Sequence, residues 1–108
     1  MKRTLFELTT GEGETRAHNV RSAEIDGAGD LVLDGFDTDP ALGADWDAEL
    51  RVASRHVARV RALLAAEFGP GGDVLDLLEK GFGGRLTCMT KFEEWLRAKG
   101  IPVSISSE

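Results

Sequence analysis

The stretch Asp26-Gly-Ala-Gly-Asp-Leu-Val-Leu-Asp-Gly-Phe36 decides the fold, because it joins a tight turn to a buried strand. Its Asp-Gly pair is the strongest short-range signal for a β-hairpin in the chain. The apolar residues that follow the turn predict a short, well-buried strand over Asp30–Phe36. We therefore expect strands to pair across residues 26–29.

Two further strand segments precede this turn. Lys2–Thr9 carries apolar residues among polar ones and ends in the glycine-bearing turn 10–14. Thr15–Ile25 alternates loosely and is polar, so we expect it at an edge of the sheet. Together with the buried strand, these segments predict a meander.

A fourth strand follows on the C-terminal side. Residues 37–45 are expected to form a loop, with Pro40 and Gly43 as breakers. Trp46–Ala53 then alternates apolar with charged residues, which predicts a strand with one solvated face. The same stretch could also open the helix that follows it.

Helical spacing of apolar residues predicts three helices, over Arg55–Phe68, Val74–Lys80 and about Thr87 or Lys91 to Lys99. We expect Ser54 and Asp73 to be the N-caps of the first two. Thr90 and Glu93 match a capping box for the third. Each helix is followed by glycine, which is typical of a helix end.

A last strand is predicted over Ile101–Ile105, where Pro102 places it at an edge or makes it start late. The order ββββαααβ predicts an α+β fold. In this fold a mostly antiparallel sheet of four or five strands, the N-terminal meander plus the C-terminal strand, is covered on one face by the helices. The length of 108 residues indicates a single domain, 1–108.

Charge and composition narrow the classes of function. The net charge is −6, and residues 1–50 contribute −8 while residues 51–108 contribute +2. An acidic half disfavours nucleic acid and would steer a basic protein partner. No apolar run approaches the roughly 20 residues of a membrane helix, and the N-terminus lacks the apolar region of a signal peptide. We therefore expect a cytoplasmic protein, either a monomer or a homodimer.

No residue pattern typical of catalysis or metal binding is present. Asp37 and Asp39 begin a calcium-loop pattern that fails in the following positions. His18 and His56 lie on different elements, and Cys88, the single cysteine, is interpreted as a structural thiol. We predict no catalytic residue, no metal and no cofactor.

Two clusters are candidate binding surfaces. The acidic cluster surrounds an aromatic residue of a type common in interface hot spots, and consists of Asp34, Asp37, Asp39, Asp45, Trp46 and Asp47. The basic cluster is a possible docking stripe on and before the first helix, and consists of Arg51, Arg55 and Arg59. Internal ion pairs with Glu49, Asp47 or Glu67 are the alternative interpretation of that stripe.

Several stretches resemble small uncharacterised bacterial proteins from GC-rich genomes. They are the run Gly72-Asp-Val-Leu-Asp-Leu-Leu-Glu-Lys-Gly-Phe-Gly-Gly84, Phe92-Glu-Glu-Trp-Leu96, Lys99-Gly-Ile-Pro-Val103 and the strand Gly29–Gly35. The resemblance covers nearly the whole chain and implies no catalytic motif. In size, acidity and layout these proteins are similar to the immunity proteins that neutralise bacterial polymorphic toxins.

The leading hypothesis is a non-enzymatic, acidic protein-binding module, in its sharper form an immunity-type inhibitor of a basic toxin. The alternatives are a small-ligand binder, an enzyme that uses Cys88 or His56, and a regulatory module that docks through the arginine stripe.

Overall fold

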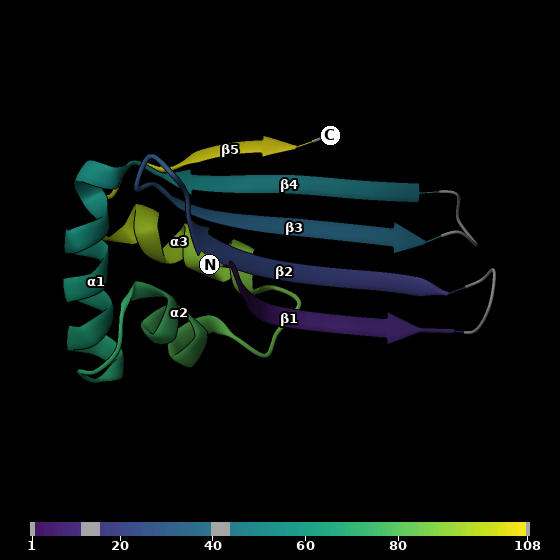
Figure 1. Cartoon of the computed structure of the whole chain (residues 1–108), viewed down its shortest axis with the longest axis horizontal. Helices are drawn as coiled ribbons and strands as arrows, with labels where there is room; N and C mark the ends of the chain where they lie inside the picture. The colour runs from purple at the N-terminus through teal and green to yellow at the C-terminus, as the bar shows by residue number, and fades with distance from the viewer. Residues whose placement is uncertain (1, 12–15, 40–43, 108) are drawn as a thin grey trace.

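The computed structural model describes residues 2–11, 16–39 and 44–107. Within these residues, five strands form one antiparallel sheet and three helices lie against it (Figure 1). The strands are β1 (Lys2–Thr10), β2 (Ala17–Ile25), β3 (Leu31–Asp39), β4 (Ala44–Val52) and β5 (Ser104–Ser107). The helices are α1 (Ser54–Phe68), α2 (Val74–Phe82) and α3 (Cys88–Ala98). The predicted α+β fold and the order ββββαααβ are confirmed.

The strands follow one another across the sheet in the order β1-β2-β3-β4-β5. The polar strand β2 therefore lies inside the sheet, and its predicted edge position is wrong. Its polar residues are accommodated because one face of the sheet is open and because Arg21, on the other face, pairs with Asp37. The two edges of the sheet are β1 and β5.

The β3–β4 hairpin is longer than the sequence pattern predicts. Of the residues assigned to a loop over 37–45, Asp37–Asp39 belong to β3 and Ala44 and Asp45 to β4. The ladder continues through the pair Asp39↔Ala44, so backbone pairing overrides the low strand propensity of aspartate. Pro40 and Gly43 lie outside the described residues.

The core lies between the sheet and the helices. Strand residues with fully buried side chains, such as Leu33 and Leu50, face α1, α2 and α3. Burial of such side chains removes apolar surface from water and is the main stabilising contribution. From the helices, Leu64, Leu77 and Phe92 complete the packing.

The start of α1 is held differently from the prediction. Ala53, not Ser54, occupies the N-cap position, and its side chain has no capping group. Instead the backbone N–H of Ser54 donates to the Asp30 carboxylate at 2.8 Å. The predicted cap on α2 is confirmed, because the Asp73 side chain accepts from the N–H of Asp76 in a capping box.

The predicted capping box on α3 is wrong. The helix already begins at Cys88, so Thr90 lies within its first turn, and Thr87 at the N-cap makes no side-chain bond. The earlier start buries Cys88 and Met89 against the core. The last strand agrees with both expectations drawn from Pro102: β5 is an edge strand and starts only at Ser104.

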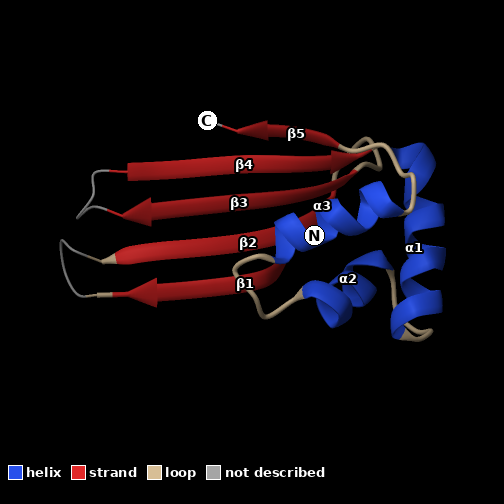
Figure 2. Ribbon diagram, turned by 180° about the vertical axis from the view of Figure 1, so that it is seen from behind, coloured by secondary structure: helices blue, strands red, loops and turns tan. Residues whose placement is uncertain are grey.

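The strands extend past the helices at one end of the sheet (Figure 2). We call this part, residues 8–10, 17–20, 36–39 and 44–47, the bare end. Large apolar side chains are exposed there, with Leu8 at 44%, Phe36 at 45% and Trp46 at 39%. In the described part of the chain, no helix combines the length and apolar character needed to cross a membrane.

Candidate functional site

The register of the β3–β4 hairpin divides the predicted acidic cluster between two faces. Asp37 pairs with Trp46 across the ladder, and both lie on the helix side together with the buried pair Leu33 and Leu50. Asp39 shares that face. The residues on the opposite, open face are Asp34, Asp45 and Asp47. The six predicted residues therefore form two surfaces rather than one.

Arg21 organises the helix-side surface. It is 5% exposed and donates to both carboxylate oxygens of Asp37, at 2.7 and 3.1 Å, and to the carbonyl of Val20 at 2.9 Å. Its guanidinium carbon lies 4.9 Å from the centroid of the Trp46 ring. This bidentate pair and cation–π contact fix the direction of the indole.

Gly35 makes room for Trp46 beside the start of α3. A Cβ atom at this position would lie 2.9 Å from the sulfur of Met89 and 2.9 Å from Cζ3 of Trp46. Because such distances are shorter than real Cβ contacts, only glycine lets both side chains approach the strand. Sequence reasoning missed Arg21, Gly35 and Met89. Arg21 could have been found from the sequence, because the alternation of side chains along β2 places it on the same face as Ala23.

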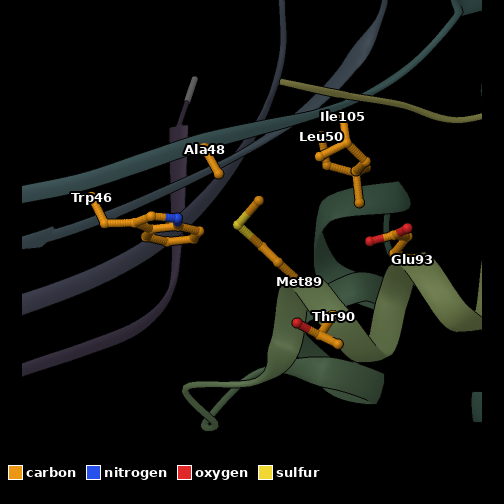
Figure 3. A pocket seen from close by; sticks show the side chains of 7 residues that line it. All are labelled: Trp46, Ala48, Leu50, Met89, Thr90, Glu93 and Ile105. Atoms are coloured by element: carbon orange, nitrogen blue, oxygen red, sulfur yellow. The ribbon is translucent and has the colours of Figure 1, made fainter. Parts of the chain in front are cut away.

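A cavity of about 90 Å³ opens between β4, β5 and α3. It is lined by Trp46, Ala48, Leu50, Met89, Thr90, Glu93 and Ile105 (Figure 3). Most of the lining is apolar, and besides the indole of Trp46 its polar side chains are Thr90 and Glu93. Ile105 is 44% exposed, so the cavity is reached from the β5 side of the sheet.

The open face of the sheet carries an apolar residue among carboxylates. Phe36 pairs across the ladder with Asp47 and on its other side with Val20. Asp34 contacts Lys2 at 3.5 Å. Among the described residues, Asp45 and Asp47 have no ion-pair partner. This face is therefore negatively charged around an exposed aromatic ring.

The predicted arginine stripe is not a continuous surface. Arg51 lies on β4 and pairs with Asp26 at 2.6 Å, Asp30 at 2.9 Å and Glu49 at 3.3 Å. Hydrogen bonding to these carboxylates raises the pKa of Arg51 above its ordinary value. The pKa of Asp26 is lowered, first by Arg51 and then by a backbone N–H.

The two helical members of the stripe differ as well. Arg59 donates to the carbonyl of Lys99 at 3.3 Å. Arg55 is exposed and has no ion pair within the described ranges. Glu67, expected as a partner, instead accepts from the Trp95 indole N–H.

The groups considered for catalysis are separated. Cys88 is fully buried, and burial raises the pKa of its thiol. His18 contacts Glu7 at 2.8 Å on the sheet, while His56 lies in the first turn of α1 with its buried Nε2 unpartnered. Among residues 2–11, 16–39 and 44–107, no group of three or more His, Cys, Asp or Glu side chains is placed to hold a metal.

Comparison with known proteins gives one partial similarity. A stretch of 54 residues is 44% identical to the bifunctional protein HldE of Nitrobacter winogradskyi, and covers 47% of this chain. The match spans 11% of the length of that protein. No family model and no solved structure matches this chain.

Proposed function

We propose that this chain is a non-enzymatic, acidic protein-binding module that takes a basic partner at the bare end of the sheet. The observation that carries the proposal is the exposure of Phe36 and Trp46 on opposite faces of one hairpin, with the carboxylates of Asp45 and Asp47 on the Phe36 face without an ion pair among the described residues. Aromatic residues surrounded by charge are typical of interface hot spots with a polar rim. An immunity-type inhibitor of a basic toxin is the form of this function that fits the charge.

A small-ligand binder that uses the cavity beside Trp46 is the second candidate, and the size of the cavity gives it less support. Its volume of about 90 Å³ is below the few hundred Å³ usual for small-molecule sites. This size fits one side chain of a protein partner better than a free metabolite. Docking through the arginine stripe has less support, because Arg51 is already paired with three carboxylates.

The experiment is affinity capture from the source organism with a matched set of baits. Wild-type chain, an Asp45→Asn/Asp47→Asn variant and a Glu79→Gln/Glu94→Gln variant are immobilised and washed at low and high salt. Retained proteins are identified and quantified by mass spectrometry. The two variants lose the same charge, but only the first loses it at the bare end.

We expect one basic protein to be retained by the wild type and by the Glu79/Glu94 variant. The Asp45/Asp47 variant should retain less of this protein, and high salt should release it from every bait. Added salt screens the attraction between exposed charges, because the Debye length falls from about 10 Å at 0.1 M to about 3 Å at 1 M. Equal retention on both variants, or no retained protein at low salt, would reject the proposal.

A further inference from the structure

We propose that the open face of the sheet binds a basic amphipathic helix of the partner, centred on Phe36. This inference rests on the proposed function and names the face that binds and the kind of segment that it takes. The helix would lie along a row of four side chains, one from each of the strands β1 to β4. We call it the Phe36 row, and it consists of Glu7, Val20, Phe36 and Asp47.

The Phe36 row follows from the register of three ladders. Glu7 pairs with Val20 across the β1–β2 ladder. Phe36 pairs with Val20 on one side and with Asp47 on the other. Paired residues on neighbouring strands share a face, so an apolar pair lies between two carboxylates. Because neighbouring strands lie about 4.8 Å apart, the two ends of the row are about 14 Å apart.

The helices of this chain leave the Phe36 row exposed. All three lie on the opposite side of the sheet (Figure 1, Figure 2). Phe36 is 45% exposed, and Glu7 and Asp47 are exposed as well. The centre of the row lies on β2 and β3, which are paired on both sides, so a partner must bind there through side chains. A helix suits this surface, because its backbone groups are bonded internally and its side chains point outward.

The dimensions of the row match one side of a helix laid across the strands. Side chains at positions i, i+4, i+7 and i+11 share one helix face. The first and the last are about 16 Å apart along the helix axis. Apolar residues at i+4 and i+7 would rest on Val20 and Phe36. Lysine or arginine at i and i+11 would reach the carboxylates at the two ends, since their flexible stems take up the small difference in length.

Negative charge on the open face is concentrated at the Phe36 row. Toward α1, Arg51 is already bound to three carboxylates. The Phe36 row and the next row toward the strand tips contain Glu7, Asp45 and Asp47 but no lysine or arginine. Glu7 contacts His18 at 2.8 Å, and Asp45 and Asp47 have no ion pair among the described residues. This part of the face therefore attracts cationic side chains.

The same charge disfavours other occupants. Nucleic acid and anionic lipid surfaces are repelled by carboxylates. Two copies packed through their open faces would bring their carboxylates together, and each copy carries a net charge of −6. The exposed arginines of α1 are also a poor match, because that helix presents small residues beside them instead of large apolar ones: Ala58, Ala62 and Ala66.

The test is an NMR titration of the full chain, labelled at its methyl groups, with a defined helical probe. The probe is an acetylated and amidated peptide of about 16 residues, built from alanine and glutamine to favour a helix. It carries lysine at i and i+11 and leucine at i+4 and i+7. A control peptide of the same composition carries its lysines at i+2 and i+9, on the side of the helix opposite the leucines. Methyl signals of Val20 report on the open face and those of Leu8 on the helix side, because the register places these residues on opposite faces.

We expect the probe to shift the Val20 methyl signals and to bind about fivefold more tightly than the control peptide at low salt. Phe36→Thr, which keeps a residue that favours strands, should weaken binding about tenfold through loss of apolar contact. Leu8→Thr is the matched control, because it removes a side chain of similar exposure, 44% against 45%, from the helix side. This variant should keep the affinity of the wild type.

The charge of the row is tested in the same titration. Asp47→Asn should weaken binding of the probe about threefold, because one of the two cationic side chains loses its partner. Glu94→Gln removes the same charge from the exposed side of α3 and should leave affinity unchanged. Circular dichroism of every variant establishes that the fold is kept.

Equal binding of the two peptides would overturn the proposal, because charge alone would then explain binding. Shifts centred on Leu8, or equal losses in Phe36→Thr and Leu8→Thr, would overturn the binding face yet leave the proposed acidic binding module intact. Val20 shifts that depend on protein concentration without peptide would assign the face to a second copy. Absence of any shift at millimolar probe would reject helix binding, while the capture experiment still decides the proposed function independently.

Discussion

A charged side chain at an inward-facing strand position requires a partner, and Arg21 finds two in Asp37 and Trp46. The alternation of side chains along β2 places Arg21 on the helix side of the sheet. A single sequence does not show which carboxylate pairs with it. That pairing depends on the β2–β3 register, which puts Asp37 opposite Asn19 and next to Arg21. This is why the sequence indicated Asp37 as a surface acid, whereas the structure places it in an internal pair.

Replacing Arg21 tests the energetic role of this pair. Arg21→Met should lower the free energy of unfolding by about 2 kcal/mol, because Asp37 would keep a charge at a half-buried position without its donor. Urea unfolding monitored by circular dichroism measures the change. Arg55→Met, at an exposed arginine of α1, should change stability by less than about 0.5 kcal/mol. Similar losses in both variants would contradict the assignment.

Gly35 is tested by adding one methyl group. Gly35→Ala should lower the free energy of unfolding by about 1–3 kcal/mol, since the new Cβ overlaps Met89 and Trp46. The displaced indole should also change the tryptophan emission. Gly27→Ala is the matched control, because a Cβ there meets nothing within 4 Å. Thermal unfolding that is identical in both variants would show that the strand and α3 adjust without cost.

At the scale of elements, the sequence predicted the type of each strand and helix and several of their ends, such as Phe68 for α1, but not all of them. Alternation in Trp46–Ala53 and helical spacing in Arg55–Phe68 predicted β4 and α1, because these periods reflect which face is buried. The end of β3 was missed and the start of α3 was left between Thr87 and Lys91, since tertiary contacts decide both. Asp37–Asp39 join the ladder through β4, and Cys88 joins its helix by burial against the core.

The connection between the β2–β3 turn, β4 and α1 should depend on pH. Asp26 accepts from Arg51 at 2.6 Å, which lowers its pKa below 3.8. Because the folded state favours the carboxylate, its stabilising contribution is complete above about pH 5 and is lost as pH falls through the lowered pKa. Asp26→Asn should therefore reduce stability at pH 7 and make the loss between pH 5 and 2.5 smaller. Urea midpoints across this range provide the measurement.

A control for the pH experiment is Asp45→Asn, on an exposed strand position without an ion pair among the described residues. This variant should keep the acid-induced loss of the wild type. A loss of equal size in the Asp26 variant would show that other carboxylates dominate the acid transition.

At the scale of the whole molecule, the bare end makes the protein more elongated than a compact domain with the same number of residues. Its radius of gyration is 14.6 Å, compared with about 13 Å expected for this length. The extents of 44 × 26 × 25 Å along the principal axes agree with a sheet that extends beyond its helices. The sequence predicted that helices cover one face, but the extent of that coverage depends on where each helix docks.

Amide hydrogen exchange should show this uneven coverage along the central strand β3. Residues Leu31–Thr38 of β3 are paired on both sides, so their N–H groups differ mainly in how much core lies beneath them. We expect strong protection for Leu31–Leu33 and weaker protection for Phe36–Thr38, which local opening can reach without disrupting the core. Exchange followed by NMR at neutral pH would measure it, and uniform protection along β3 would contradict the expectation.

The order of strands also has a consequence for folding. Neighbours in the sheet from β1 to β4 are neighbours in the chain, so these ladders can close as hairpins with a small loss of chain entropy. The β4–β5 ladder instead closes across all of α1, α2 and α3, from Val52 to Ser104. We expect it to form last, after the helices have docked. Because β5 supplies Ile105 to the cavity, we expect that wall of the cavity to form last.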